Sequence, residues 1–212
     1  MKIYFRKEDF KMEETKKKLT TQRMVIYAFM GALSFGLMMI HLPFKYLGFL
    51  ELEFSDIPAI VCGFAYGPVA AVIIEFIKNV LKVLINTTTG GVGELANFIV
   101  SIGYVVPCAI LFRGLKKNNE TVRNIIAGLI GTLSMAAVGI VINYFITVPL
   151  YAKLFGGMEA VVGVCSQTIP AIKGVGTVVI LGITPFNLVK GIIISIVGIL
   201  VYKSIKGILA KF

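Results

Sequence analysis

The chain has 212 residues, of which 57% are hydrophobic and only 15% are charged. A soluble domain carries about 25% charged residues, and the mean hydropathy here is +0.89. These values exclude an ordinary soluble domain and predict an all-helical integral membrane protein. The net charge of +10 does not indicate a nucleic-acid partner, because the basic residues cluster between apolar runs as topology signals do.

Few residues are available for metal or covalent chemistry. Three cysteines lie far apart in the sequence and form neither a disulfide framework nor a zinc motif. The chain has one histidine, no phosphate-binding loop and no nucleophile motif. We therefore expect no catalytic residue, no metal site, no cofactor and no ATPase motif.

Six apolar segments are expected to cross the membrane after a basic tail at residues 1–22. A span needs about 20 apolar residues, and the second of the six is short. The predicted spans are 24–42, 57–66, 69–85, 95–112, 125–149 and 185–202. The segment 150–183 is glycine-rich and has room for one short or interfacial helix. The predicted organisation is a tail at 1–22 and a six-helix membrane domain at 23–212.

The distribution of lysine and arginine predicts the orientation. Fifteen of these residues lie in the tail, in the loop after the fourth span and at the C-terminal end, which six spans place on one side. About four lie on the other side. Since positive residues favour the cytoplasmic side, both termini are expected there, and the connectors 42–55, 86–94 and 150–183 are expected to face outward.

Small residues form a row along the first span, at Ala28, Ala32 and Gly36. Such a row lets the backbones of two helices approach closely. The partner helix is either within this chain or in another subunit, and the spacing does not distinguish the two.

The first outward connector alternates with a period of two over residues 49–54. Leu50, Leu52 and Phe54 share one face, and the two intervening glutamates share the other. This pattern predicts a short extended segment lying over an apolar surface. Together with Tyr46, it is suited to covering a flat aromatic ligand, and the alternative is an interfacial aromatic belt.

Charged and polar residues also interrupt the third and fourth spans. Glu75 and Lys78 are three residues apart, which favours an ion pair within the helix over a ligand contact, and Lys82 follows one turn later. Glu94 and Asn97 occupy the first two turns of the fourth span. They either line a cavity or cap and bridge helices.

A lysine in the last span requires an explanation. Thr184 and Pro185 read as the N-cap and first residue of a helix, which places Asn187 and Lys190 near the outer boundary. A charge within a span is a functional hypothesis by default, with snorkelling or a structural ion pair as the alternatives. With Asn143 at a similar depth, these groups predict a site for a polar ligand.

Several of these pieces occur together in one known family. The chain after its tail resembles the riboflavin-specific substrate-binding membrane subunit, or S component, of energy-coupling factor (ECF) vitamin transporters. The pieces that carry the resemblance are Leu50–Pro58, Gly67–Ala70, Gly93–Phe98, Asn143–Tyr151 and Ile183–Gly191. They appear in the family's order and cover all six predicted spans.

The resemblance implies a six-helix fold with an outward-facing pocket roofed by the first connector. It implies that Asn143, Asn187 and Lys190 hydrogen-bond riboflavin, and Asn97, Glu94, Tyr46, Leu50 and Phe54 are the further expected contacts. The row of Ala28, Ala32 and Gly36 would dock on a transmembrane coupling subunit, with two ATPase subunits supplying energy. The implied location is the plasma membrane of a prokaryote.

Three alternatives remain at this point. The same architecture could serve another vitamin or a phosphorylated flavin. A membrane-embedded enzyme acting on lipids would usually show an acidic cluster on its cytoplasmic side, and the cytoplasmic connectors hold only Glu120 outside the tail. A scaffold protein would not need Lys190.

Overall fold

The computed structural model describes residues 20–40, 43, 45–115 and 120–210, which form a bundle of helices. The predicted tail at 1–22 therefore lies almost wholly outside the described residues. The elements are, in chain order, α2 (Thr21–Met38), α3 (Ile57–Tyr66), α4 (Pro68–Asn86), α5 (Val92–Gly114), α6 (Glu120–Ile142), η1 (Asn143–Thr147), α7 (Val148–Leu154), α8 (Met158–Thr168), α9 (Val175–Thr177), η2 (Val178–Ile183) and α10 (Thr184–Leu209).

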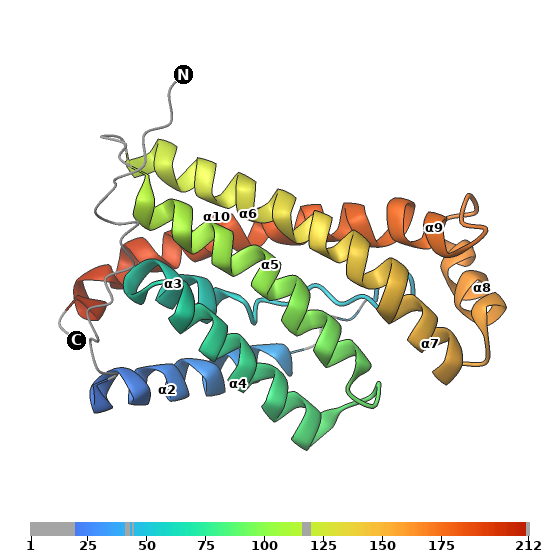
Figure 1. Ribbon diagram of the computed structural model, residues 1–212, viewed down its shortest axis with the longest axis horizontal. Helices are drawn as coiled ribbons and strands as arrows, with labels where there is room; N and C mark the ends of the chain where they lie inside the picture. Colours follow the sequence, from blue (N-terminus) through green and yellow to red (C-terminus); the bar gives the residue numbers. More distant parts are fainter. Residues whose placement is uncertain (1–19, 41–42, 44, 116–119, 211–212) are drawn as a thin grey trace.

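The long helices lie side by side along the longest axis of the molecule (Figure 1). The start of α2 and the end of α10 lie at the same end of the bundle, and α8 lies at the opposite end. Within the described residues, three continuous helices are long and apolar enough to cross a membrane: Val92–Gly114, Glu120–Leu154 and Val175–Leu209. The apolar helix α3 is shorter.

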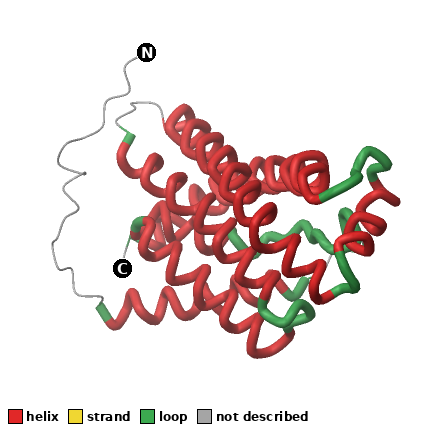
Figure 2. Tube along the Cα trace, turned by 45° about the vertical axis from the view of Figure 1, so that its right-hand side comes forward, coloured by secondary structure: helices red, strands yellow, loops and turns green. Residues whose placement is uncertain are grey.

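The connector before α3 runs lengthwise among the helices, where Figures 1 and 2 both place it. The sequence predicted a connector at 42–55, and Leu47, Glu53 and Ser55 of this segment are buried. Its extended backbone and α3 together follow the length of the bundle. This arrangement carries two carboxylates, Glu53 and Asp56, into the interior.

The last helix does not begin at Thr184, and that prediction is wrong. The helix is continuous from Val175 to Leu209, and the Thr184 side chain makes no capping bond. Lys190 consequently lies about four turns inside the helix rather than five residues from its start. In the same way, the fifth span continues past Pro149 to Leu154.

A π-helical turn precedes each of the two prolines within these long helices, Pro149 and Pro185. The turn η1 comes before Pro149, and η2 comes before Pro185. A proline removes one N–H donor from a helix, and a wider turn changes the hydrogen-bond register at that point. A threonine hydroxyl binds the carbonyl five residues earlier in each case: Thr147 reaches Ile142 at 3.4 Å, and Thr184 reaches Val179 at 2.8 Å.

The buried apolar residues of the described chain form two clusters. The larger one joins α3, α4, α5, α6 and α10 around residues such as Ile60, Ile74 and Tyr104. The smaller one, at the end of the bundle that holds α8, joins the connector, α7, α8 and η2 around Leu47 and Val161. Residues of both clusters also line the polar cavity that is described below.

The small residues of α2 divide between two faces. Gly31 is buried against α4, where an added Cβ would meet the Ile77 side chain at 2.6 Å, so glycine permits this close approach. Ala28, Ala32 and Gly36 are exposed. The row predicted from the sequence therefore packs on nothing within the described chain, which leaves its second reading, a partner subunit, as a proposal.

Candidate ligand cavity

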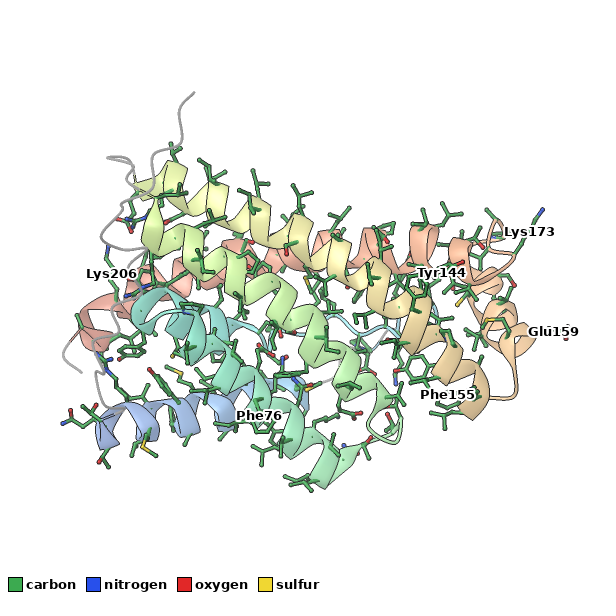
Figure 3. The ribbon with its side chains drawn as sticks, in the orientation of Figure 1. Phe76, Tyr144, Phe155, Glu159, Lys173 and Lys206 are labelled. Atoms are coloured by element: carbon green, nitrogen blue, oxygen red, sulfur yellow. The ribbon has the colours of Figure 1, made fainter. Side chains whose placement is uncertain are left out.

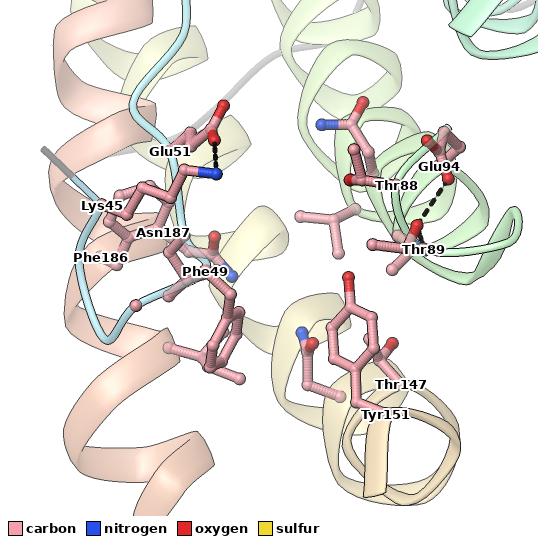
Figure 4. Close-up of a pocket in the computed structure, with 18 of the residues that line it drawn as sticks. Lys45, Phe49, Glu51, Thr88, Thr89, Glu94, Thr147, Tyr151, Phe186 and Asn187 are labelled. Atoms are coloured by element: carbon pink, nitrogen blue, oxygen red, sulfur yellow. Dashed lines mark hydrogen bonds and ion pairs between the residues drawn. The ribbon is translucent and has the colours of Figure 1, made fainter. Parts of the chain in front are cut away.

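A cavity of about 550 Å³ opens between the connector, α4, α5, η1, α7, α8 and α10 (Figure 4). Cavities of about 300–1,000 Å³ hold small organic ligands. Its walls come from both apolar clusters, with Val100 and Met135 on one side and Val161 and Ile183 on the other. Polar side chains from elements distant in sequence converge on the space between them.

Six of the eight residues predicted to contact a ligand line this cavity. They are Leu50, Glu94, Asn97, Asn143, Asn187 and Lys190. Tyr46 lies one layer behind, because its ring stacks on Phe186, which does line the cavity, with centroids 5.9 Å apart. Phe54 is 37% exposed and borders an apolar groove between α2, α3 and α10 instead.

The connector presents its acidic face inward, opposite to the sequence-based expectation. Glu53 is 8% exposed and lines the cavity, whereas Phe54 points to the outer groove. The two faces are not strictly separated, because Leu50 lines the cavity together with Glu51 and Glu53. Glu51 also lines the cavity and pairs with Lys45 at 2.7 Å (Figure 4).

The two asparagines differ in how they are held. The Asn143 amide donates to the carbonyl of Gly139 at 2.7 Å, which fixes its orientation within the helix and leaves its oxygen available. The Asn187 residue is 6% exposed and lines the cavity, and its amide makes no hydrogen bond to the described residues but is open to the cavity. Glycine at 139 leaves room for the Asn187 amide, since an added Cβ would lie 2.5 Å from its nitrogen and displace it.

Lys190 belongs to an ion cluster as well as to the cavity wall. Its ammonium lies 3.2 Å from Glu53 and 3.2 Å from Asp56. Glu53 also accepts from the Asn97 amide at 2.8 Å. The structural ion pair that the sequence left open as an alternative is therefore present. A lysine ammonium has three donors, and the hydrogen bond to Glu53 uses one of them, so Lys190 keeps donor capacity for a ligand.

A second part of the cluster lies deeper in the bundle. Lys78 lies 2.6 Å from Asp56 and 2.5 Å from Glu75, and all three side chains are fully buried. The pair of Glu75 and Lys78 within α4 confirms the sequence prediction. Ser101 of α5 also donates to Asp56, at 2.9 Å. The connector, α3, α4, α5 and α10 are thus joined by one polar network.

Several cavity residues gave no signal in the sequence. Glu53 was assigned to the face away from the covered surface, and Asp56, which lies behind the cavity wall, was not singled out. The hydroxyl of Thr89, which donates to Glu94 at 2.8 Å (Figure 4), lies in a loop with no distinctive motif. Their partners are up to 137 residues away in the chain, so local spacing carried no information about these contacts.

The arrangement suits reversible binding of a polar, partly aromatic molecule. Asparagine amides offer both donors and acceptors, lysine offers a donor, and the remaining wall is apolar. Tyr151 and Phe49, which meet edge to face with centroids 5.8 Å apart, supply aromatic surface (Figure 4). Within the described residues, no group of three or more histidine, cysteine or acidic side chains is placed to hold a metal ion.

Comparison with known proteins gives a consistent result. A family model described as "ECF transporter, substrate-specific component" matches residues 22–202. The riboflavin transporter FmnP of Bacillus subtilis is 33% identical over 193 residues, covering 89% of this chain and 94% of FmnP. The riboflavin transporter RibU of Staphylococcus aureus is 31% identical over 201 residues, covering 92% of this chain and 98% of RibU.

A solved structure is also similar. It is described as "Structure and mechanism of the S component of a bacterial ECF transporter", is 29% identical in sequence and has a TM-score of 0.63. The match covers 89% of this chain and 97% of that chain. The similarity therefore extends over nearly all of both folds.

Proposed function

The chain belongs to the substrate-specific components of ECF transporters, and from this premise we propose that it captures riboflavin and delivers it inward when coupled to an ATP-driven module. It is a multi-pass membrane component of a transporter rather than an enzyme. The relatives reported above are named as riboflavin transporters. Their names support the choice of ligand, and the cavity supports the mode of binding.

The Asn187 amide is the observation that carries the proposal. It is nearly fully buried, lines the cavity and has no hydrogen-bond partner in the described chain. Its amide is open to the cavity, so a ligand with matching groups can bind both its oxygen and its nitrogen. The pyrimidine edge of a flavin alternates carbonyl acceptors with an N–H donor, so the two cavity asparagines and the remaining donor of Lys190 match it.

The orientation and the partners are part of the same proposal. Lys206 lies at the end of the bundle where α2 begins, and Glu159 and Lys173 lie at the opposite end (Figure 3). With six spans, counting the connector and α3 as one, the end that holds α8 faces outward and both termini are cytoplasmic. The exposed row of Ala28 and Ala32 docks on the transmembrane coupling subunit, and two ATPase subunits supply energy.

Titration of the detergent-purified protein with riboflavin tests this function. Binding is expected to quench riboflavin fluorescence with one-to-one stoichiometry. Asn187→Leu keeps the side-chain volume, removes the amide and is expected to weaken binding about tenfold or more. The matched control is Asn124→Leu, because Asn124 is also buried without a hydrogen-bond partner but does not line the cavity.

Two results would contradict the proposal. A colourless preparation that leaves riboflavin fluorescence unchanged would reject the ligand. An equal loss of affinity in Asn187→Leu and Asn124→Leu would reject the site, because only one of these amides lines the cavity.

A further inference from the structure

Lys82 of α4 is a buried cation in the wall of the ligand cavity. The residue is 8% exposed and lines the cavity. The hydrogen-bond partner of its ammonium is the thioether sulfur of Met39 at 3.6 Å. A thioether is a weak acceptor. In the described chain, no carboxylate lies within ion-pair distance of this ammonium.

The other buried lysines of the described chain are compensated. Lys78, one turn earlier on α4, lies between Asp56 and Glu75. Lys190, which lines the same cavity from α10, lies between Glu53 and Asp56. Since a buried charge is costly unless it is paired, the position of Lys82 is explained most directly by a negative group that arrives with the ligand.

The carboxylates of the cavity are already engaged elsewhere. Glu51 pairs with Lys45, and Glu53 accepts from Lys190 and Asn97. Glu94 accepts from a threonine hydroxyl and lies in the first turn of α5, where the helix dipole favours its charge. None of them is placed to neutralise Lys82 internally.

We propose that Lys82 forms an anion subsite of the cavity and binds the phosphate of a phosphorylated flavin. This inference rests on the proposed function, because it assumes that the flavin occupies the same cavity. A phosphate monoester carries about −1.5 to −2 charges near neutral pH and three acceptor oxygens. Thr88, just beyond the end of α4, lines the same cavity and offers a hydroxyl donor (Figure 4).

Parallel titrations with riboflavin and flavin mononucleotide test the subsite. Lys82→Met removes the charge, keeps an unbranched side chain and places a thioether beside Met39. It is expected to weaken mononucleotide binding by about 10- to 100-fold, the effect of one charge-assisted hydrogen bond, and to weaken mononucleotide binding about tenfold more than it weakens riboflavin binding. Lys82→Arg keeps the charge and should preserve most of the mononucleotide affinity.

Four outcomes would overturn the inference. They are an equal loss of affinity for both flavins, no loss for either, wild-type protein that binds riboflavin but not the mononucleotide, and a Lys82→Arg variant as weak as Lys82→Met. Only a wild-type protein that binds neither flavin would overturn the proposed function as well. Inorganic phosphate, added as a competitor, separates phosphate carried by a flavin from free phosphate. Competition that Lys82→Met abolishes supports the subsite, and competition that persists in Lys82→Met contradicts it.

Discussion

Replacement of Lys78 by methionine should destabilise the protein strongly. The ammonium lies 2.6 Å from Asp56 and 2.5 Å from Glu75, and all three side chains are fully buried. At an effective dielectric constant of about 20, each contact is worth about 6 kcal/mol before desolvation is counted. Desolvation offsets much of that attraction, and removing one partner of a buried pair typically costs about 3–5 kcal/mol because a buried charge is left unpaired.

The two carboxylates would be affected unequally. Asp56 keeps Lys190 at 3.2 Å and the Ser101 hydroxyl at 2.9 Å. Glu75 has no other ion-pair partner in the described chain, and neither of its oxygens has a hydrogen bond. The double variant Lys78→Met with Glu75→Leu removes that orphaned carboxylate. It should therefore recover a substantial part of the lost stability.

The chain carries its own unfolding reporters, because Cys62, Cys108 and Cys165 are free and buried. A dye that fluoresces on reaction with a thiol will follow their exposure as the temperature rises. For a domain of this size about 1 kcal/mol shifts the Tm by about 2–4 °C, so Lys78→Met should lower it by roughly 6–20 °C. The control is Lys203→Met, which removes an exposed charge near the end of α10.

A Tm for Lys78→Met within about 2 °C of the wild-type value would refute this reasoning, because that shift corresponds to less than about 1 kcal/mol. It would mean that the Lys78 ion pairs contribute little after desolvation. A double variant less stable than Lys78→Met alone would contradict the assignment of Glu75 as the orphaned group.

Two further variants separate binding from coupling. Gly139→Ala should weaken riboflavin binding with little loss of stability, because the added Cβ would displace the movable end of the Asn187 side chain. The control is Gly36→Ala, whose Cβ would meet nothing within 4 Å. Both variants are measured in the riboflavin titration and in the melting assay. Replacing Ala28 and Ala32 by tryptophan should block riboflavin uptake in cells yet leave binding by purified protein unchanged, and a parallel loss of both would count against a partner-docking role for this exposed row.

The sequence located most helix boundaries where a strong local signal existed. The predicted spans 57–66 and 69–85 leave only Gly67 and Pro68 between them, and the backbone turns there, with a φ of +105° at Gly67 and proline at the start of α4. The long segment after the fifth span was expected to hold one short helix, and α8 lies there. Such signals are local, so they can be read without knowledge of the fold.

The same kind of local signal failed at Pro149 and Pro185. Each was read as a boundary, since proline usually ends or begins a helix. The structure instead places a π-helical turn before each proline and continues the helix. Each π-helical turn is accompanied by a threonine hydroxyl that donates to the carbonyl five residues earlier, Thr147 in one case and Thr184 in the other. Sequence spacing alone does not choose between a helix start and a π turn.

The polar interior shows where pattern reasoning ends. The pair Glu75 and Lys78 was predicted because three residues of spacing put both on one helix face. The contact between Lys190 and Glu53 spans 137 positions, and nothing in either segment indicates the other. In the connector, the alternation was clear from the sequence, but the polarity of the surface that the segment covers was not.

Lys190 links the cavity to the polar network, and this position bears on how a ligand would be held. Its ammonium is fixed by Glu53 of the connector and by Asp56, which Lys78 of α4 and Ser101 of α5 hold in turn. A donor held on both sides before binding loses little conformational entropy when a ligand arrives. The network therefore pre-organises one wall of the cavity, and because the connector belongs to it, any ligand that draws Lys190 away from Glu53 would also alter how that connector is held.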